Sequence, residues 1–291
     1  MTDAKTGAKT DPANTIAFQG ERGANSDMAC RVVFPDLGTL GCYSFADAFS
    51  AVRGGEARLA MIPIDNTVAG RVADIHHLLP DSGLHIIGEH YQRVDHHLLA
   101  LPGTDIGDLT HVHSHVHALN QCRGLIQDLM VEPVVHADTA GAANMIKHRD
   151  DPTQGAIASK LAAEIYELDV LRENIEDAEH NTTRFLIMAA DPESPKPSAD
   201  KVVTSFVFRV KNIPAALYKA LGGFATNGVN MTKLESYIVG GSFHAAQFFA
   251  EVEGHPEDPA MKRAFEELEF FTHEIKIMGA YPAAPERDVI G

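Results

Sequence analysis

Two threonines and an arginine, Thr182, Thr183 and Arg184, stand directly before a strongly apolar run in this sequence. The run 185–190 predicts a buried strand, and open α/β sheets place their ligand sites at the ends of such strands. Side chains alternate along a strand, so Thr183 and Phe185 share one face while Thr182 and Arg184 share the other. If Thr183 faces a cleft, Arg184 points away from it unless the strand is bulged. The alternative is a polar entry to the strand with a structural arginine.

Other polar side chains stand at the predicted ends of strands and helices. A glycine-rich turn over 20–26 precedes a helix, with Asn25 or Ser26 as its N-cap. Its glycines let an anion approach free backbone N–H groups, although neither a Walker loop nor a complete GxGxxG is present. Similar side chains occur at Asn66, Thr67, Ser114, Gln121 and Thr139. Such side chains favour a reaction that depends on oriented hydrogen bonds over one that needs a strong base, and they fit a binding protein equally well.

Metal or nucleophilic chemistry has weak support in the sequence. Four histidines alternate along one segment, namely His111, His113, His115 and His117. Four alternating ligands require a continuous strand, whereas Ser114 is predicted to cap a helix that begins at His115. Cys122 has no neighbour in the sequence that would activate a thiol, and Asp65 is better explained as a turn carboxylate. No Ser-His-Asp arrangement or G-x-S-x-G elbow is visible. We therefore expect neither a metal nor a cofactor.

Length and charge limit the class of protein. The chain has 291 residues, enough for two domains, and a net charge of −16, which disfavours nucleic acid and anionic membranes as partners. An anionic substrate remains compatible, because the local field of a site can oppose the net charge. Three cysteines without a CxxC pair indicate reduced thiols in a cytoplasm. Residues 1–14 lack an apolar signal-peptide core and are interpreted as a disordered tail, and no apolar run is long enough to span a membrane.

Alternating strands and helices predict an α/β protein with a mostly parallel sheet in each of two lobes. The first lobe spans residues 15–90 and is completed by 182–190, while the second spans 95–180. The ligand is expected in a cleft between the lobes, with the two crossings near Tyr91 and Asn181 as the hinge.

Three further features organise the rest of the chain. Ser44 and Asp47 resemble a capping box for a helix over 45–53, and a longer helix is predicted over 115–129. A polar, proline-rich stretch at 191–201 predicts a linker. Residues 202–284 then follow the order βαββαβ of a ferredoxin-like module, with a helix from Pro214 and a hairpin at Gly240-Gly241.

Taken together, these segments resemble prephenate dehydratase from Ile16 to about Tyr281. Thr183-Arg184-Phe185 matches the Thr-Arg-Phe signature of that family. Pro63-Ile64-Asp65-Asn66-Thr67 matches its Pro-Ile-Glu-Asn-Ser/Thr, with aspartate in place of glutamate. The other matching segments are Gly20, Gly23 and Ser26; Ser114-His115 with Gln121-Cys122, where Val116 replaces the usual proline; residues 138–143; and residues 156–159. Each motif is weak alone, whereas their order and spacing are specific.

The resemblance implies a two-lobed, periplasmic-binding-protein-like catalytic domain that converts prephenate into phenylpyruvate, water and carbon dioxide in phenylalanine biosynthesis. Thr183 is implied to be the proton donor or a donor relay. Asn66 and Gln121 are implied to hydrogen-bond the substrate, and Ser26 with its turn to receive a carboxylate. The remaining substrate-binding candidates are Thr67, Ser114, Thr139 and Arg184. The alternatives are an arogenate dehydratase and a non-catalytic protein that senses aromatic compounds.

The C-terminal module resembles an ACT domain, which implies feedback regulation by phenylalanine and a homodimer or homotetramer. Residues 214–218 stand where the family has Gly-Ala-Leu-Val, and residues 235–238 (Glu-Ser-Tyr-Ile) where it has Glu-Ser-Arg-Pro. Ala215 replaces a glycine, and its methyl group is expected to narrow the approach of the backbone to the effector, so regulation that is weaker or of the opposite sign stays open. The implied effector site comprises Ala215, Ala216, Leu217, Asn230, Glu235 and Ser236.

Overall fold

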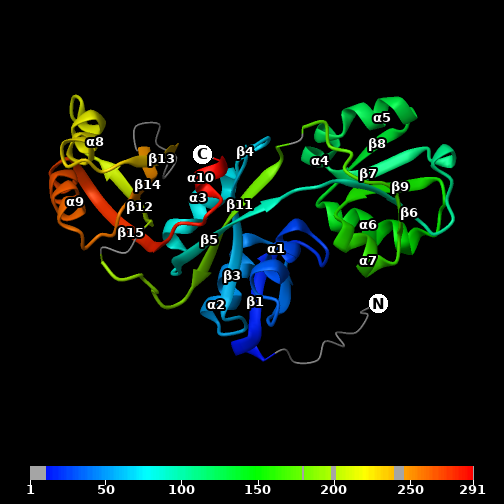
Figure 1. The fold of residues 1–291 in the computed structure, drawn as a ribbon, viewed down its shortest axis with the longest axis horizontal. Helices are drawn as coiled ribbons and strands as arrows, with labels where there is room; N and C mark the ends of the chain where they lie inside the picture. Colours follow the sequence, from blue (N-terminus) through cyan, green and yellow to red (C-terminus); the bar gives the residue numbers. More distant parts are fainter. Residues whose placement is uncertain (1–10, 179, 198–200, 239–245, 291) are drawn as a thin grey trace. The chain divides into compact units, whose positions relative to one another are not determined.

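A computed structural model describes residues 11–178, 180–197, 201–238 and 246–290 (Figure 1). The chain forms two compact units: Met1–Arg71 with Tyr91–Phe185 (unit 1), and Val72–His90 with Leu186–Gly291 (unit 2). No helix in these described ranges is long and apolar enough to cross a membrane.

The last residues of the stretch 1–14, which is interpreted from its sequence as a disordered tail, belong to the described structure. Pro12–Asn14 form a short 3-10 helix, capped by the Asp11 side chain, which accepts a hydrogen bond from Ala13 N. A proline at the start of the turn and the Asp11 cap explain this order. Residues 1–10 lie outside the described residues.

The first sheet has the strand order β2-β1-β3-β11-β5, with the short strand β4 paired to β3. Its strands are β1 (Thr15–Gln19), β2 (Gly38–Cys42), β3 (Leu59–Asn66), β4 (Gly70–Arg71), β5 (His85–Arg93) and β11 (Thr182–Ala189). β1 runs parallel to both β2 and β3, and its centre at Ile16, Ala17 and Phe18 is fully buried. Strands β5 and β11 each continue from one unit into the other.

Two helices of this part of the chain are α1 (Asn25–Val33) and α2 (Phe45–Arg53). The capping box predicted for α2 is confirmed, because Asp47 N donates to Ser44 Oγ at 3.1 Å and Ser44 N donates to Asp47 Oδ2 at 3.1 Å. The N-cap predicted for α1 is wrong, since Ala24 occupies that position without a side-chain cap. The buried carboxylate of Asp27 instead accepts a hydrogen bond from Gly23 N at 2.8 Å.

The second sheet, also in unit 1, has the order β10-β6-β9-β7-β8. Its strands are β6 (His97–Ala100), β7 (His111–His115), β8 (Glu132–His136), β9 (Gln154–Ala158) and β10 (Asp169–Arg172). β7 is parallel to β8 and β9, whereas β6 is antiparallel to both of its neighbours, β9 and β10. Helices α4 (Val116–Gln121) and α5 (Arg123–Leu129) lie on one side of this sheet, and α6 (Thr139–Arg149) and α7 (Lys160–Tyr166) on the other (Figure 1).

The single helix predicted over 115–129 is wrong, because the helix breaks at Cys122. The carboxylate of Asp177 accepts hydrogen bonds from Arg123 N at 2.9 Å and Gly124 N at 3.1 Å, so a distant segment caps the second helix. The predicted cap at Ser114 is also wrong. That residue lies inside β7, and His115 caps α4 through its ring nitrogen.

The C-terminal module in unit 2 has the order β13-β14-β12-β15, which confirms the ferredoxin-like topology. Its elements are β12 (Val202–Val210), α8 (Ala216–Thr226), β13 (Met231–Ile238), β14 (Ala246–Glu253), α9 (Pro259–Phe271) and β15 (Thr272–Pro282). Both helices cover one face of the sheet (Figure 1), over a core that includes Phe206, Phe208 and Phe224. Helix α8 begins at Ala216 and not at Pro214, and the predicted Gly240-Gly241 hairpin lies outside the described residues.

Residues 72–90 pack against the opposite face of that sheet. This segment contains α3 (Ala73–Leu78), and the ring of His76 meets Phe249 edge-on at 5.4 Å between centroids. A Cβ atom at Gly279 would overlap the carbonyl oxygen of Ile86, so glycine allows β5 and β15 to approach closely. This packing explains why residues 72–90 group with unit 2, although they are predicted from the sequence to lie in the first lobe, residues 15–90.

Candidate active site

Asn66, at the end of β3, holds the hydroxyl group of Thr183. Its Nδ2 donates to Thr183 Oγ1 at 3.0 Å and to Asn181 Oδ1 at 2.8 Å. Its Oδ1 accepts from the backbone N–H groups of Val68 at 3.0 Å and Ala69 at 2.7 Å. Backbone N–H groups can only donate, so they fix the orientation of this amide. Because both hydrogens of Nδ2 are engaged, Asn66 orients Thr183, and direct binding of a substrate would require one of these bonds to break.

Thr183 is half-buried and presents a hydroxyl hydrogen that Asn66 does not use. Since Oγ1 accepts a hydrogen bond from Asn66, the O–H hydrogen of Thr183 remains available for donation to a ligand. The donated hydrogen bond also stabilises negative charge that develops on Oγ1. The preceding residue, Thr182, pairs through its backbone with Thr67, which accepts from Thr182 N at 2.9 Å through its hydroxyl.

Asn181, Gln121 and His96 extend these contacts into the second lobe. Asn181 Nδ2 donates to Gln121 Oε1 at 2.9 Å, and His96 Nε2 lies 2.8 Å from the same oxygen. We call the five side chains of His96, Gln121, Asn181, Asn66 and Thr183 the polar network. It joins β3 and β11 to helix α4, and it brings together three predicted site residues that are far apart in sequence.

The polar network carries no formal charge. His96 is 3% exposed, and burial lowers the pKa of its imidazole, so the ring is neutral near neutral pH. A neutral, hydrogen-bonded set orients a substrate more than it exchanges protons with it.

Arg184 lies on the other face of β11, as the alternation along the strand predicts. Its side chain is 7% exposed, lies 3.6 Å from the carboxylate of Asp65 and stacks over the ring of Tyr91 at 5.9 Å. These contacts with Asp65 and Tyr91 indicate that Arg184 has a structural role within unit 1. They also pair Asp65 with a cation, and Asp65 lies in strand β3 next to Asn66, so its interpretation as a turn carboxylate is wrong.

The glycine-rich turn of 20–26 contacts the second lobe. Gly23 has a φ of +89°, and a Cβ atom there would lie 2.8 Å from Ala162 Cα at the start of α7. Ser159 Oγ donates to Gly23 O at 2.5 Å, and Tyr166 Oη donates to Arg22 O at 2.9 Å. Glycine at position 23 is therefore required by packing against α7. Ser26 follows in the first turn of α1 and is 9% exposed.

The other predicted substrate-binding residues lie apart from the polar network or are engaged elsewhere. Thr67 is exposed, and its hydroxyl joins the backbone of His180 to that of Thr182. Ser114 is fully buried, and its hydroxyl donates to Ile157 O at 2.6 Å in the neighbouring strand. Thr139 is the first residue of α6 and is half-buried.

Three of the four alternating histidines, His111, His113 and His115, lie in strand β7 of the second sheet, and His117 lies in α4. His113 is 3% exposed, and its two ring nitrogens lie 3.1 Å from His136 Nε2 and 2.7 Å from Gln154 Oε1. Burial lowers the pKa of His113 and raises that of the Cys122 thiol, so neither group is charged near neutral pH. His115 caps α4, as described above.

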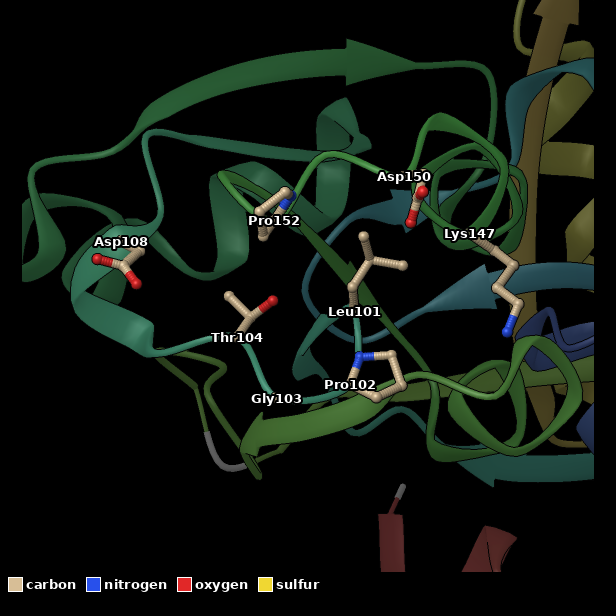
Figure 2. A pocket seen from close by; sticks show the side chains of 8 residues that line it. All are labelled: Leu101, Pro102, Gly103, Thr104, Asp108, Lys147, Asp150 and Pro152. Carbon is tan, nitrogen blue, oxygen red and sulfur yellow. The ribbon is translucent and has the colours of Figure 1, made fainter.

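A hollow of about 390 Å³ lies in the second lobe (Figure 2), and none of its lining residues is a predicted site residue. Its lining comprises Leu101, Pro102, Gly103, Thr104, Asp108, Lys147, Asp150 and Pro152. Lys147 already pairs with Glu167 at 2.9 Å, so the two aspartates leave this hollow unfavourable for a dianion.

The predicted effector residues lie in unit 2. Ala215 adopts a left-handed backbone, with φ 59° and ψ 23°, immediately before α8. Asn230 donates from its side chain to Glu253 at 3.1 Å, and Glu235 lies 3.6 Å from Lys233 Nζ. Ser236 is exposed on β13. Ala216 is buried, and Leu217 packs against the core of the module.

Two members of the polar network, Asn181 and His96, were missed by sequence reasoning. From the sequence, Asn181 is placed only at a crossing between the lobes, and His96 is assigned no role in the site. The signal that could have found Asn181 is an asparagine directly before the threonine pair, at the point where an extended strand begins.

Comparisons with known proteins agree on one family. The family model described as prephenate dehydratase matches residues 16–193. A Komagataeibacter europaeus protein named bifunctional N-acyl-homoserine lactone acylase/prephenate dehydratase is 53% identical over 272 residues, which cover 94% of this chain and 97% of that protein. The Arabidopsis thaliana arogenate dehydratase/prephenate dehydratase 1, chloroplastic, is 37% identical, with 92% and 71% covered. The structure of the Arthrobacter aurescens prephenate dehydratase in complex with L-Phe has a TM-score of 0.83 and 28% identity, with 94% of each chain covered.

Proposed function

The chain belongs to the prephenate dehydratase family, whose enzymes are lyases, and we propose that it converts prephenate into phenylpyruvate. The hydroxyl group on the prephenate ring leaves as water, the ring carboxylate leaves as carbon dioxide, and the ring becomes aromatic. The observation that carries this proposal is the 3.0 Å hydrogen bond from Asn66 Nδ2 to Thr183 Oγ1. Asn66 is held by the backbone and donates to Thr183 Oγ1, so the hydroxyl hydrogen of Thr183 is available to a ligand at the end of a core strand.

In this mechanism Thr183 donates its hydroxyl hydrogen to the leaving hydroxyl group of the substrate. The electron pair of the breaking carbon–carboxylate bond enters the ring as the carbon–oxygen bond breaks, so no external oxidant or reductant is needed. The hydrogen bond from Asn66 stabilises the oxygen of Thr183 until solvent returns the proton. Well-placed acid catalysis accelerates a reaction by about 10²–10⁴-fold, and a threonine hydroxyl, being a weak acid, contributes no more than this. Orientation of the substrate supplies much of the remaining acceleration.

The substrate is tested with prephenate and arogenate in parallel. Phenylpyruvate is detected by its absorbance in alkali, and phenylalanine formed from arogenate is detected by chromatography. We expect the higher kcat/KM with prephenate. A higher kcat/KM with arogenate would assign the chain to that substrate, which the name of the Arabidopsis relative also includes.

A second candidate activity is hydrolysis of an N-acyl-homoserine lactone. The observation that favours it is 53% identity with a relative whose name includes that acylase. Within unit 1, burial raises the pKa of both Cys30 and Cys122, so these thiols are unsuited to be its nucleophile. Release of a fatty acid from the acylated lactone tests this activity. If Thr183→Ala abolishes phenylpyruvate formation and leaves fatty acid release intact, the two reactions use different groups.

The C-terminal module is proposed to be an ACT domain that binds phenylalanine and inhibits the enzyme. The module has the expected ferredoxin-like topology, and a relative of 28% identity has been crystallised with L-Phe. The polar groups of the effector would meet Asn230 and the backbone near Ala215, and its ring would meet Leu217. A homodimer or homotetramer, working in the cytoplasm, completes this proposal, because β13 is an edge strand of the sheet.

Calorimetry of the full chain with phenylalanine, alongside activity assays and sedimentation, tests the regulatory proposal. We expect saturable binding, reduced turnover and an oligomer. An effector shifts an equilibrium only if it binds one state more tightly than the other. Absence of heat and of any change in turnover would leave the module without a regulatory role.

A further inference from the structure

The direction of every hydrogen bond in the polar network follows from two backbone groups. Val68 N and Ala69 N can only donate, so the oxygen of the Asn66 amide faces them and its nitrogen faces Asn181. Asn181 must therefore accept through Oδ1 and donate through Nδ2 to Gln121 Oε1. The same oxygen lies 2.8 Å from His96 Nε2, so that nitrogen must carry a hydrogen.

This direction defines the state of the His96 ring. With the hydrogen on Nε2 and a neutral imidazole, Nδ1 is a bare acceptor. Among the described residues, this atom is buried and has no hydrogen-bond partner. A buried acceptor without a partner destabilises a fold, so stability alone does not account for a histidine at this position.

We propose that His96 is a positioning residue that fixes the side-chain amide of Gln121 for the substrate; this inference rests on the proposed dehydratase function. Gln121 Oε1 accepts from two donors, Asn181 and His96. A rotation of the amide by half a turn would place its NH₂ group against both donors and break both bonds. The half-buried Gln121 therefore keeps two N–H hydrogens for a carboxylate or hydroxyl of the ligand.

The backbone around His96 and Gln121 is held as firmly as the side chains. His96 N donates to Glu176 Oε2 at 2.9 Å, and Ile175 N donates to His96 O at 2.9 Å. Asp177 N donates to Gln121 O at 2.6 Å. One segment, residues 175–177, thus binds the main chain of both residues, so the distance between His96 and Gln121 is set independently of the ligand.

The test compares three full-length variants by their KM and kcat for prephenate. His96→Leu removes the donor, and His96→Gln retains an N–H near the Nε2 position. His113→Leu is the matched control, because His113 is also 3% exposed and its Nε2 lies 2.7 Å from a glutamine oxygen, Gln154 Oε1, outside the polar network. We expect His96→Leu to raise KM roughly 10-fold, the effect of losing one orienting hydrogen bond. His96→Gln should recover most of this loss, and His113→Leu should leave KM within about 2-fold.

Equal KM values for His96→Leu and His113→Leu would overturn the proposal, as would a His96→Gln variant as impaired as His96→Leu. Nitrogen-15 NMR of the histidine rings gives a readout that does not depend on activity, with the His96→Gln spectrum for assignment. It should show His96 protonated on Nε2 alone near neutral pH, and protonation on Nδ1 would overturn the inference. A parent enzyme that forms no phenylpyruvate would reject the proposed function, while the NMR result would still decide the direction of the network.

Discussion

Asn66 donates a hydrogen bond to Thr183 Oγ1 over 3.0 Å, although the two residues are 117 positions apart in the chain. Both belong to adjacent strands of the first sheet, β3 and β11, and the contact exists because polar residues stand at the C-terminal end of β3 and at the N-terminal start of β11. The amide of Asn66 is itself held by the turn that follows it. The geometry of the proposed proton donor therefore depends on a turn of three residues, 67–69, between β3 and β4.

Asn66→Asp separates the two roles of this side chain. One carboxylate oxygen still accepts from Val68 N and Ala69 N, so the turn is retained, but the donor to both Thr183 and Asn181 is lost. Thr183 would then donate to the new carboxylate instead of to the substrate. We expect kcat to fall by about 10–150-fold with little change in thermal stability, as for loss of a hydrogen bond at a developing charge. Asn120→Asp, at an exposed position of α4, is the control and should retain parental kcat.

How far the sequence predicts this fold depends on whether a signal is local. The capping box of Ser44 and Asp47 lies within four residues and marks the start of α2 correctly, while Gly54 and Gly55 mark its end. The break at Cys122 could not be predicted, because the cap of α5 comes from Asp177, more than fifty residues away. Strand β2 was also missed, since its sequence Gly-Thr-Leu-Gly-Cys has two glycines and no apolar alternation.

The candidate site shows the same limit. Thr183, Asn66 and Gln121 were predicted through matching motifs, and the structure connects them in one polar network. Their connection runs through Asn181, which belongs to the same short stretch as Thr183 but was not assigned a role. A hydrogen bond between two side-chain amides depends on tertiary placement, so single-sequence patterns cannot reveal it.

Ala215→Gly tests the left-handed turn before α8. An L-residue in this conformation costs roughly 1–2 kcal/mol, while glycine gives back up to about 1 kcal/mol through greater freedom of the unfolded chain. We therefore expect a net gain in unfolding free energy of up to about 1 kcal/mol.

Ala225→Gly makes the same substitution at an exposed position of α8 and should instead destabilise by roughly 0.5–1 kcal/mol. Urea unfolding followed by circular dichroism is suitable, because the chain has no tryptophan. Two losses of equal size would show that the turn at Ala215 is unstrained.

Arg287→Leu tests the contact between β5 and the C-terminal module. Arg287 lies 2.6 Å from Glu89 and 2.8 Å from Glu251, and the side chains of these two acids are 0% and 1% exposed. Its removal takes the guanidinium group away from two buried carboxylates, so we expect a loss of about 3–5 kcal/mol of unfolding free energy.

Lys262→Met is the matched control for Arg287→Leu. Lys262 pairs with Glu257 at 2.8 Å, but both side chains are more than half exposed, and the expected loss is below about 1 kcal/mol. Similar losses for both variants would mean that Arg287 does not hold the buried acids together.

The most direct test of the proposed mechanism is the rate of phenylpyruvate formation from prephenate by Thr183→Ala, Thr183→Ser and Thr182→Ala. Thr182 belongs to the same strand, and side chains alternate, so Thr182→Ala controls for loss of a hydroxyl near the site. We predict that Thr183→Ala lowers kcat by about 10²-fold or more with the fold intact, that Thr183→Ser retains more activity, and that Thr182→Ala stays near the parent. A Thr183→Ala variant with nearly parental kcat would contradict the assignment of Thr183 as the proton donor.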